Sequence, residues 1–376
     1  MKKILILFFL ILLVLFISAK EVKNENLPLK GNWDFGLKKL WETSTAGEDV
    51  LINVSTLRVD DSGNLFVFDI KQFRFFVYSP DGNFLYSFGK RGEGPGEYRM
   101  VFNFFLKGNR VIVPDMSKIH FFDISGKYLK SEIPGGTFIF PRIFIDEDRF
   151  VYVPSRMGQQ KGSDRLELVD LNTKKKNLIC EIPAEDVLEA TASRQGGQAR
   201  LNIKDANTTP GVIVGYHDNF LYFGKNDRYL INKSDLNGKE LFSFSVSGRE
   251  RNKITPAIKR KRLESISLNG RKIPDDMIKQ LMKTMPDQCT YFNRIRVDKN
   301  GLIYVFIPDL TNETGQHIDI FSSEGKYLYR ANLILPEGYK FRVSNHAFKD
   351  NYLYVFAEDD DGEVKLIKYT IQLPKN

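Results

Sequence analysis

The chain has 376 residues, of which 42% are hydrophobic and 13% aromatic, and its formal net charge is +8. This much apolar material excludes a disordered or collagen-like chain, and the length allows two or three ordinary domains or one large β architecture. Two cysteines exclude a disulfide scaffold and a four-thiolate zinc site, and four scattered histidines argue against a histidine-rich metal centre.

The N-terminus has the pattern of a targeting segment. Two lysines precede an unbroken apolar run, Ile4–Ile17, and the small residues Ser18 and Ala19 follow it. This arrangement is typical of a secretory signal peptide, and the run is short for a spanning helix. We expect residues 1–19 to be a signal peptide, with a retained N-terminal anchor as the alternative. The protein is then exported, periplasmic or extracellular, and touches a membrane only through this segment if it is not cleaved.

The rest of the chain repeats one unit of four short β runs. In residues 57–88 these runs are rich in β-branched and aromatic residues and are separated by turn signals at Asp61–Asn64, Ile70–Gln72 and Pro80–Asn83. Similar units follow at residues 101–132, 142–182, 212–246, 293–333 and 341–373. Repeats of about 40 residues with four strands each are the signature of a β-propeller.

The sixth unit ends after its third strand, and the N-terminus offers the missing fourth. Residues 36–44 align with the outer strands of the other units. A ring closed in this way leaves no open sheet edge. We therefore predict an all-β fold, a six-bladed β-propeller with four antiparallel strands per blade, spanning residues 36–376. Residues 20–35 are expected to be a linker.

The first unit continues into a glycine-rich stretch, Gly92–Tyr98, that reads Gly-Glu-Gly-Pro-Gly-Glu-Tyr. Together with the strand pattern before it, this stretch resembles the NHL-type repeat and, more closely, the exported six-bladed β-propeller proteins of bacteria. The resemblance implies the fold and adds little chemistry, because most members of that family have no assigned activity. Glycine-rich segments can also bind anions through backbone amides, but no helix follows this one, so we interpret it as a turn.

Long segments are expected on only one face of the propeller. The turns within each hairpin are short, whereas the longest segments, residues 184–211 and 248–291, are insertions between blades. Functional residues concentrate on loops that a rigid scaffold holds. The second insertion, between blades 4 and 5, has helical signals, and its Met277–Met285 stripe predicts either packing onto the rim or a Met-rich binding surface.

Basic residues gather in these long segments, where they are either ordinary solvated charge or an anion-binding surface, and we keep them as the candidate ligand-binding face. Two histidines are expected near the same face or the channel. The candidate ligand-binding residues are Lys90, Arg91, Arg99, Arg142, Arg156, Lys259, Arg260, Lys261, Arg262, His317 and His346.

Three other features give weaker signals. Cys180 and Cys289 are expected to be two separate thiols, and a disulfide between them is the alternative. The acidic run Glu358–Asp361 lacks the ligand spacing of an EF-hand, so calcium is the one cofactor that we keep open. The first strands of the blades, such as Leu57–Val59 and Ile295–Val297, are expected to offer mainly apolar and aromatic side chains to the channel. The one polar cluster is expected in the last blade, with Arg342, Ser344, Asn345 and His346.

These observations predict an exported, non-catalytic binding or scaffolding protein. Its partner would be a protein or an anionic glycan held on the long-loop face, and we expect a monomer that binds no nucleic acid. The alternative is a metal-dependent hydrolase or lyase of the lactonase-like propeller type with its site at the channel mouth. No residue is assigned to catalysis or to a metal.

Overall fold

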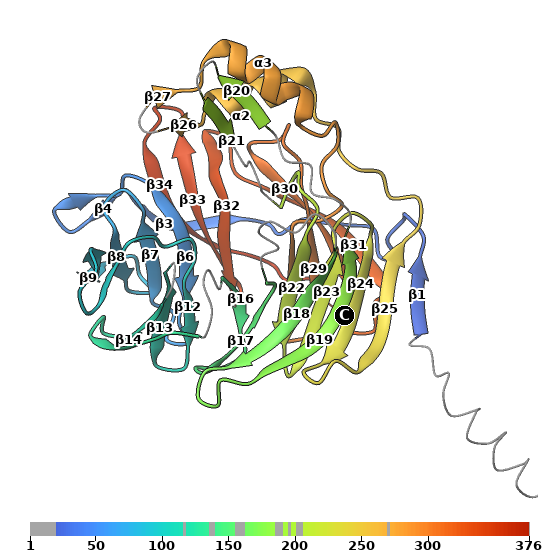
Figure 1. Ribbon diagram of the computed structural model, residues 1–376, viewed down its shortest axis with the longest axis horizontal. Coiled ribbons are helices and arrows are strands. Elements are labelled where there is room, and N and C mark those ends of the chain that lie inside the picture. The colour runs from blue at the N-terminus through green and yellow to red at the C-terminus, as the bar shows by residue number, and fades with distance from the viewer. Residues whose placement is uncertain are drawn as a thin grey trace, which may run out of the picture.

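The computed structural model describes residues 20–115, 118–134, 140–154, 162–184, 191–194, 197–200, 206–268 and 271–375. Its strands form six large sheets that stand as blades around a central axis (Figure 1). The prediction of a six-bladed propeller is confirmed. The first strands of the blades contact one another around the axis, so the chain enters each blade at the centre and leaves it at the rim.

Within each blade, the strands that follow one another in the chain pair antiparallel. Blade 1 contains β6 (Val54–Val59), β7 (Leu65–Asp69), β8 (Arg74–Tyr78) and β9 (Phe84–Phe88). Blade 2 contains β12 (Phe105–Lys107), β13 (Arg110–Pro114), β14 (Ile119–Asp123) and β15 (Tyr128–Glu132). Blade 3 contains β16 (Pro141–Phe144), β17 (Arg149–Tyr152), β18 (Gly162–Asp170) and β19 (Lys176–Ala184). Blades 4 and 5 contain β22 (Val212–His217), β23 (Phe220–Lys225), β24 (Leu230–Asp235) and β25 (Glu240–Val246); and β28 (Arg294–Val297), β29 (Ile303–Ile307), β30 (Gly315–Phe321) and β31 (Tyr327–Ile334). Blade 6 contains β32 (Tyr339–Lys349), β33 (Tyr352–Asp359) and β34 (Val364–Thr370).

The N-terminal strand β3 (Lys38–Thr43) completes blade 6, as the sequence predicts, by pairing antiparallel with β34. Trp41 fixes this closure, because its Nε1 donates a hydrogen bond to the carbonyl of Pro80 in blade 1 at 3.0 Å. The same indole lies over the β8–β9 turn, where a Cβ on Gly82 would come within 2.7 Å of the ring. Gly82 has φ +86°, so both the turn and the contact require glycine.

Residues 20–35, expected to be a linker, instead extend two blades. Strand β1 (Lys20–Asn24) pairs parallel with β25, and β2 (Asn32–Trp33) pairs parallel with β31. Figure 1 shows β1 at the rim beside β25. Asn24 fastens the segment to both blades, since its Nδ2 donates to the carbonyls of Ser245 and Gly325 at 3.0 and 2.9 Å. The sequence does not indicate these strands because they lie outside the repeated unit and Lys20–Asn24 is mostly polar.

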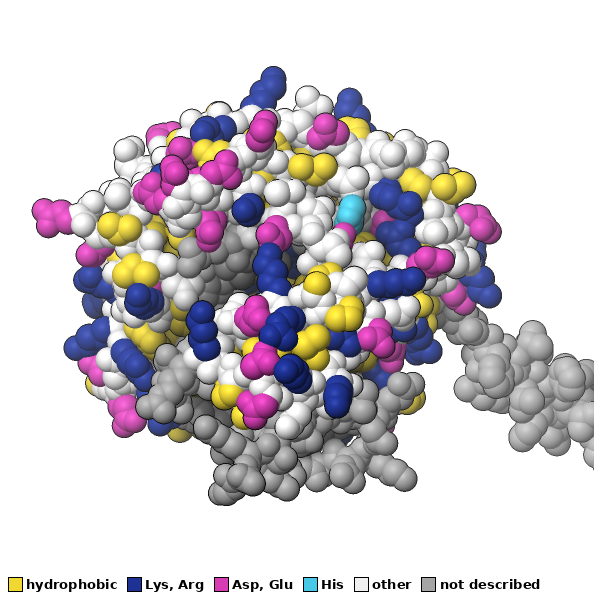
Figure 2. All heavy atoms as spheres, turned by 90° about the horizontal axis from the view of Figure 1, so that it is seen from above, with side chains coloured by type: hydrophobic (Ala, Val, Ile, Leu, Met, Phe, Trp, Pro, Cys, Tyr) yellow, Lys and Arg dark blue, Asp and Glu magenta, His cyan; other side chains and the backbone are white. Residues whose placement is uncertain are grey.

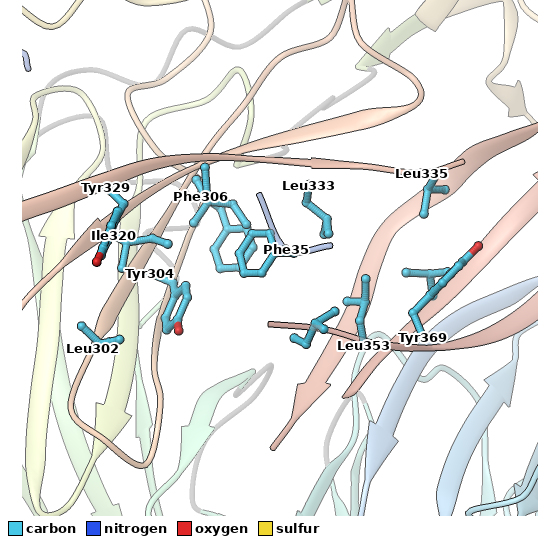
Figure 3. Packing of buried hydrophobic residues seen from close by; sticks show 14 of the residues in the cluster. Phe35, Leu302, Tyr304, Phe306, Ile320, Tyr329, Leu333, Leu335, Leu353 and Tyr369 are labelled. Carbon is cyan, nitrogen blue, oxygen red and sulfur yellow. The ribbon is translucent and has the colours of Figure 1, made fainter. Parts of the chain in front are cut away.

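The core consists of apolar layers between neighbouring blades. Figure 3 shows one of them, in which Tyr304 and Phe306 of blade 5 and Leu353 and Tyr369 of blade 6 pack around Phe35 from the N-terminal segment. All five side chains are at most 3% exposed. Burial of such aromatic rings is the main favourable contribution to blade packing.

The two insertions lie together at one end of the propeller (Figure 1). The first insertion forms β20 (Thr191–Arg194) and β21 (Gly197–Arg200). The second insertion forms α2 (Pro256–Glu264), β26 (Ser267–Leu268), β27 (Arg271–Lys272) and α3 (Asp275–Thr284), and α3 lies beside β20. Met277, Ile278 and Leu281 of α3 are buried against Leu263 and Ile273, so the methionine stripe packs internally. No helix within the described part of the chain is long and apolar enough to cross a membrane; residues 1–19, with the expected signal peptide, lie outside it.

Candidate functional site

The surface cations expected to bind a ligand are largely paired with acids. Lys90 contacts Glu97 at 2.8 Å and Arg99 contacts Glu93 at 3.5 Å. Arg91 has its guanidinium 5.0 Å from the centre of the Phe73 ring. Arg156 lies outside the described residues. This part of the long-loop face therefore carries less free positive charge than its sequence indicates.

The cations of α2 are also engaged within the insertion. Arg260 pairs with Asp275 and with Glu264, and Lys261 pairs with Glu313. Arg262 is half-buried. Lys259 is 6% exposed, and its Nζ donates to the carbonyl of Met285 and to Asp287, both at 2.7 Å. The expectation that Lys259 belongs to a ligand-binding surface is wrong, because this ammonium group holds the end of α3.

His317 forms an ion pair near the start of β30 in blade 5. Its Nε2 lies 3.3 Å from Asp309, and its Nδ1 contacts the side-chain oxygen of Asn332. The hydrogen bond to Asp309 raises the pKa of His317 and lowers the pKa of Asp309 to about 2. These partners give the histidine a structural role.

Cations line the central channel, which the sequence analysis expected to be mainly apolar. That expectation is wrong for a simple geometric reason. Successive side chains of a strand point to opposite sides, so Leu57, Ile295 and Val297 pack between blades while the alternate residues face the axis. Those alternate residues are Arg58, Arg294 and Arg296.

Arg294 and His346 form the centre of this lining. Nη2 of Arg294 donates to Nε2 of His346 at 2.8 Å, and the guanidinium lies 3.9 Å from the centre of the Phe306 ring. His346 is 5% exposed and is packed among Phe306, Phe341 and Phe348, with ring-centre distances of 5.3 to 5.9 Å. A histidine that accepts a hydrogen bond at Nε2 is neutral.

Arg58 and Arg296 are held in the same manner, by an aromatic ring and a backbone carbonyl. Arg58 donates to the carbonyl of Leu57 and to Oδ1 of Asn103, both at 2.8 Å, and lies 5.8 Å from the centre of the Phe104 ring. Arg296 donates to the carbonyl of Phe348 and lies 4.9 Å from its ring. All three guanidinium groups are therefore fixed in position before any ligand arrives.

Two more blades add cations to the channel. Lys107 of blade 2 lies 5.3 Å from the ring of Tyr216 in blade 4, which spans the axis between non-neighbouring blades. Arg142 of blade 3 is solvent-exposed on the first strand. We call these groups the channel cluster: Arg58, Lys107, Arg142, Arg294, Arg296 and His346.

Negative charge opposes the channel cluster unevenly: Asp146 and Asp61 act on Lys107, whereas no carboxylate acts on Arg58 or Arg294 within the described part of the chain. Asp298 and Asp350 act on Arg296, and Asp164 acts on Arg142. Asp298 already accepts the backbone N–H of Leu302 and the Tyr304 hydroxyl, and Asp350 pairs with Lys299 at 2.6 Å.

The pKa values of Arg58, Arg294, Arg296 and His346 are all lowered. Burial, together with the charges of Arg296 and Arg58, lowers the pKa of Arg294 to about 9. Burial also lowers the pKa of Arg58 and of Arg296 to about 10. The pKa of His346 falls well below 6.5, first through burial and then through the neighbouring Arg294 and Arg296. All of these shifts have the direction expected where burial disfavours a positive charge, and a nearby anion would oppose them.

Comparison with known proteins supports the fold. Residues 42–197, somewhat less than half of the chain, match the DUF5128 family model, which describes a 6-bladed beta-propeller. The chain has the fold that this family model describes. No curated protein matches it in sequence.

Two solved structures resemble this propeller along nearly its whole length. A member of the DUF4221 family from Bacteroides vulgatus has a TM-score of 0.58 at 10% identity, covering 91% of this chain and 99% of that one. A protein of Bacteroides fragilis, provisionally named an exported protein, has a TM-score of 0.52 at 14% identity, covering 95% and 100%. A gluconolactonase from Xanthomonas campestris covers 89% of each chain at 11% identity, but its TM-score of 0.43 is too low to bear on activity. At these identities the likeness concerns the fold alone.

Other candidate features of the propeller lie apart from the channel cluster. Cys180 and Cys289 form no disulfide. In the acidic run, Oδ1 of Asp359 accepts the backbone N–H groups of Asp361 and Glu363, which makes a turn. Within the described ranges, no three His, Cys, Asp or Glu side chains gather closely enough to hold a metal ion.

Proposed function

We propose that the propeller is an exported, non-catalytic binding protein that holds an anionic group of its ligand in the central channel. The observation that supports this most directly is the fixed, carboxylate-free pair Arg58 and Arg294 beside His346. Guanidinium groups recognise carboxylates and phosphates through paired hydrogen bonds. Export is supported by the signal-like pattern of residues 1–19.

The binding role is preferred over metal-dependent hydrolysis because of the charge in the channel. A divalent cation would meet three guanidinium groups from blades 1 and 5, which repel it. Catalytic metal sites instead need several oxygen or imidazole ligands that converge on one point. His346 is the one imidazole of the channel cluster, and Arg294 already occupies its Nε2.

The test uses small anions whose chemistry is known. Titration calorimetry at low ionic strength would measure binding of phosphate, acetate and glucuronate, with glucose as the neutral counterpart. We expect the substitutions Arg58→Gln and Arg294→Gln to weaken anion binding by tenfold or more, because a charge-assisted hydrogen bond contributes about 1.5 to 3 kcal/mol. Arg99→Gln is the matched control, since Arg99 is an exposed cation outside the channel.

Two results would overturn the proposal. Equal anion binding by Arg294→Gln and the wild-type protein would mean that the channel does not bind the anion. Stoichiometric calcium or zinc in the purified protein, with a lower melting temperature after chelation, would favour the metal-dependent enzyme instead.

A further inference from the structure

An exposed aromatic pair lies on the connections that lead into blades 2 and 3. Phe102 is 60% exposed, the highest value for a phenylalanine in the described part of the propeller, and Phe140 is 37% exposed. Their ring centres are 5.3 Å apart with the planes at 79°. Both residues precede first strands, so they lie on the long-loop side, which Figure 2 shows hollowed near its centre. Water-exposed aromatic rings that touch each other make an apolar surface without a partner.

This pair is directly connected to the channel cluster. Phe102 is followed by Asn103, whose Oδ1 accepts the hydrogen bond from Arg58. Phe140 is two residues before Arg142, which is exposed on β16. The first strands of blades 1, 2 and 3 also contact each other in sequence, β6 with β12 and β12 with β16. In the chain, the ring pair is therefore next to Asn103, the partner of Arg58, and close to Arg142.

We infer that the channel mouth binds a small amphipathic monoanion, a carboxylate on an apolar chain, with its head group at Arg58 and Arg294 and its chain over Phe102 and Phe140. This inference rests on the proposed function and narrows its ligand. A polyhydroxylated sugar acid fits less well, since two phenyl rings offer no hydrogen-bond partner to its hydroxyl groups. An alkyl chain needs none and gains free energy from leaving water.

The experiment is a calorimetric series of straight-chain carboxylates from acetate to octanoate, all below their micelle concentrations, with 1-octanol as the uncharged counterpart. Each methylene buried against the ring pair should tighten binding about twofold to fourfold. Octanoate should therefore bind at least about tenfold more tightly than butyrate. In Phe102→Ala and Phe140→Ala the dependence on chain length should flatten while acetate binding is unchanged. Leu129→Ala, at a side chain 46% exposed on the outer strand β15, is the matched control.

The outcomes separate this inference from the function on which it rests. Chain-length dependence that disappears in the Phe102 and Phe140 variants, and binding at least tenfold weaker in Arg294→Gln, support it. Carboxylates that bind equally at every length, still through Arg294, would overturn the amphipathic ligand and leave the anion-binding function intact. Octanol binding as tightly as octanoate would also overturn it. If no carboxylate or other anion binds, both proposals fail.

Discussion

Arg294 donates a hydrogen bond from Nη2 to Nε2 of His346 at 2.8 Å and so links the first strands of blades 5 and 6 across their inner edge. The cation needs this neutral acceptor, because no carboxylate among the described residues pairs with it. The two residues therefore set the charge and the rigidity of the channel together.

Arg294→Gln should leave stability nearly unchanged. The substitution removes the hydrogen bond of the guanidinium to His346 and its contact with the Phe306 ring, which contributes about 1 kcal/mol, and it also removes repulsion from Arg58 and Arg296. We expect the two effects to offset, so that the free energy of unfolding in urea stays within about 1 kcal/mol of wild type. A loss above 3 kcal/mol would mean that the arginine serves packing rather than ligand binding.

Acid should destabilise the propeller through His346. Its folded-state pKa lies well below 6.5, so between those two values the unfolded chain binds more protons at this residue than the folded chain does. The free energy of unfolding should therefore fall as the pH drops below 6.5. In His346→Asn this decline should be shallower in urea unfolding measured between pH 7.5 and 5.

His317 should give the opposite dependence of stability on pH. Its folded-state pKa is raised by Asp309, so its contribution to stability is complete below 6.5 and is lost as the pH rises through the folded value. His317→Gln should flatten stability on the alkaline side of 6.5. Identical pH profiles for the two histidine variants would contradict both assignments.

The sequence was sufficient to predict the blades and the strand that closes the ring. The β runs repeat, and the missing strand of blade 6 matches residues 36–44, where Trp41 now lies. It was not sufficient for the channel. A shift of one residue in strand register decides whether Arg58 or Leu57 faces the axis. The sequence analysis assigned the apolar residues of the first strands to the channel, and the structure places them between the blades. The ion pair between Lys261 and Glu313 was also out of reach, because the two residues are far apart in the chain.

Asp319 should be among the most sensitive positions outside the channel. This fully buried carboxylate accepts the hydroxyls of Tyr229 and Tyr327 at 2.9 and 2.6 Å and pairs with Arg249 at 2.5 Å, which ties blade 4 to blade 5. Asp319→Asn should lower the free energy of unfolding by about 3 kcal/mol, because Arg249 then remains buried without its counter-ion.

Asp61→Asn provides the comparison for that loss. Asp61 also forms an ion pair, with Lys349 at 2.7 Å, but its side chain is 93% exposed. Its substitution should change stability by less than about 1 kcal/mol in the same urea assay. Similar losses at the two aspartates would disprove the role assigned to burial.

Truncation from the N-terminus should lower stability in two steps. Deleting residues 1–30 removes β1 and opens the outer edge of blade 4, whereas deleting residues 1–45 also removes β2 and β3 and leaves blade 6 with three strands. We expect a modest fall in melting temperature for the first deletion and loss of cooperative unfolding for the second, measured by calorimetry. Equal midpoints would contradict closure by β3.

Lys259 should act on the stability of the insertion rather than on binding. Lys259→Met removes two charge-assisted hydrogen bonds at the end of α3, which we expect to cost about 2 kcal/mol locally and to speed proteolysis of residues 248–291. Lys261→Ala, at an exposed cation of the same helix, should leave the cleavage rate unchanged. If Lys259→Met loses anion binding while its proteolysis rate stays normal, Lys259 binds the ligand and does not stabilise the insertion.

The most direct test of the central claim is to locate an anion by its anomalous scattering in crystals soaked with selenate. The account predicts a selenium peak within hydrogen-bond distance of Arg58 and Arg294 in the channel, and no such peak in Arg294→Gln crystals. Selenate found only at surface cations such as Lys90, with an empty channel, would contradict the claim that the channel cluster binds anions.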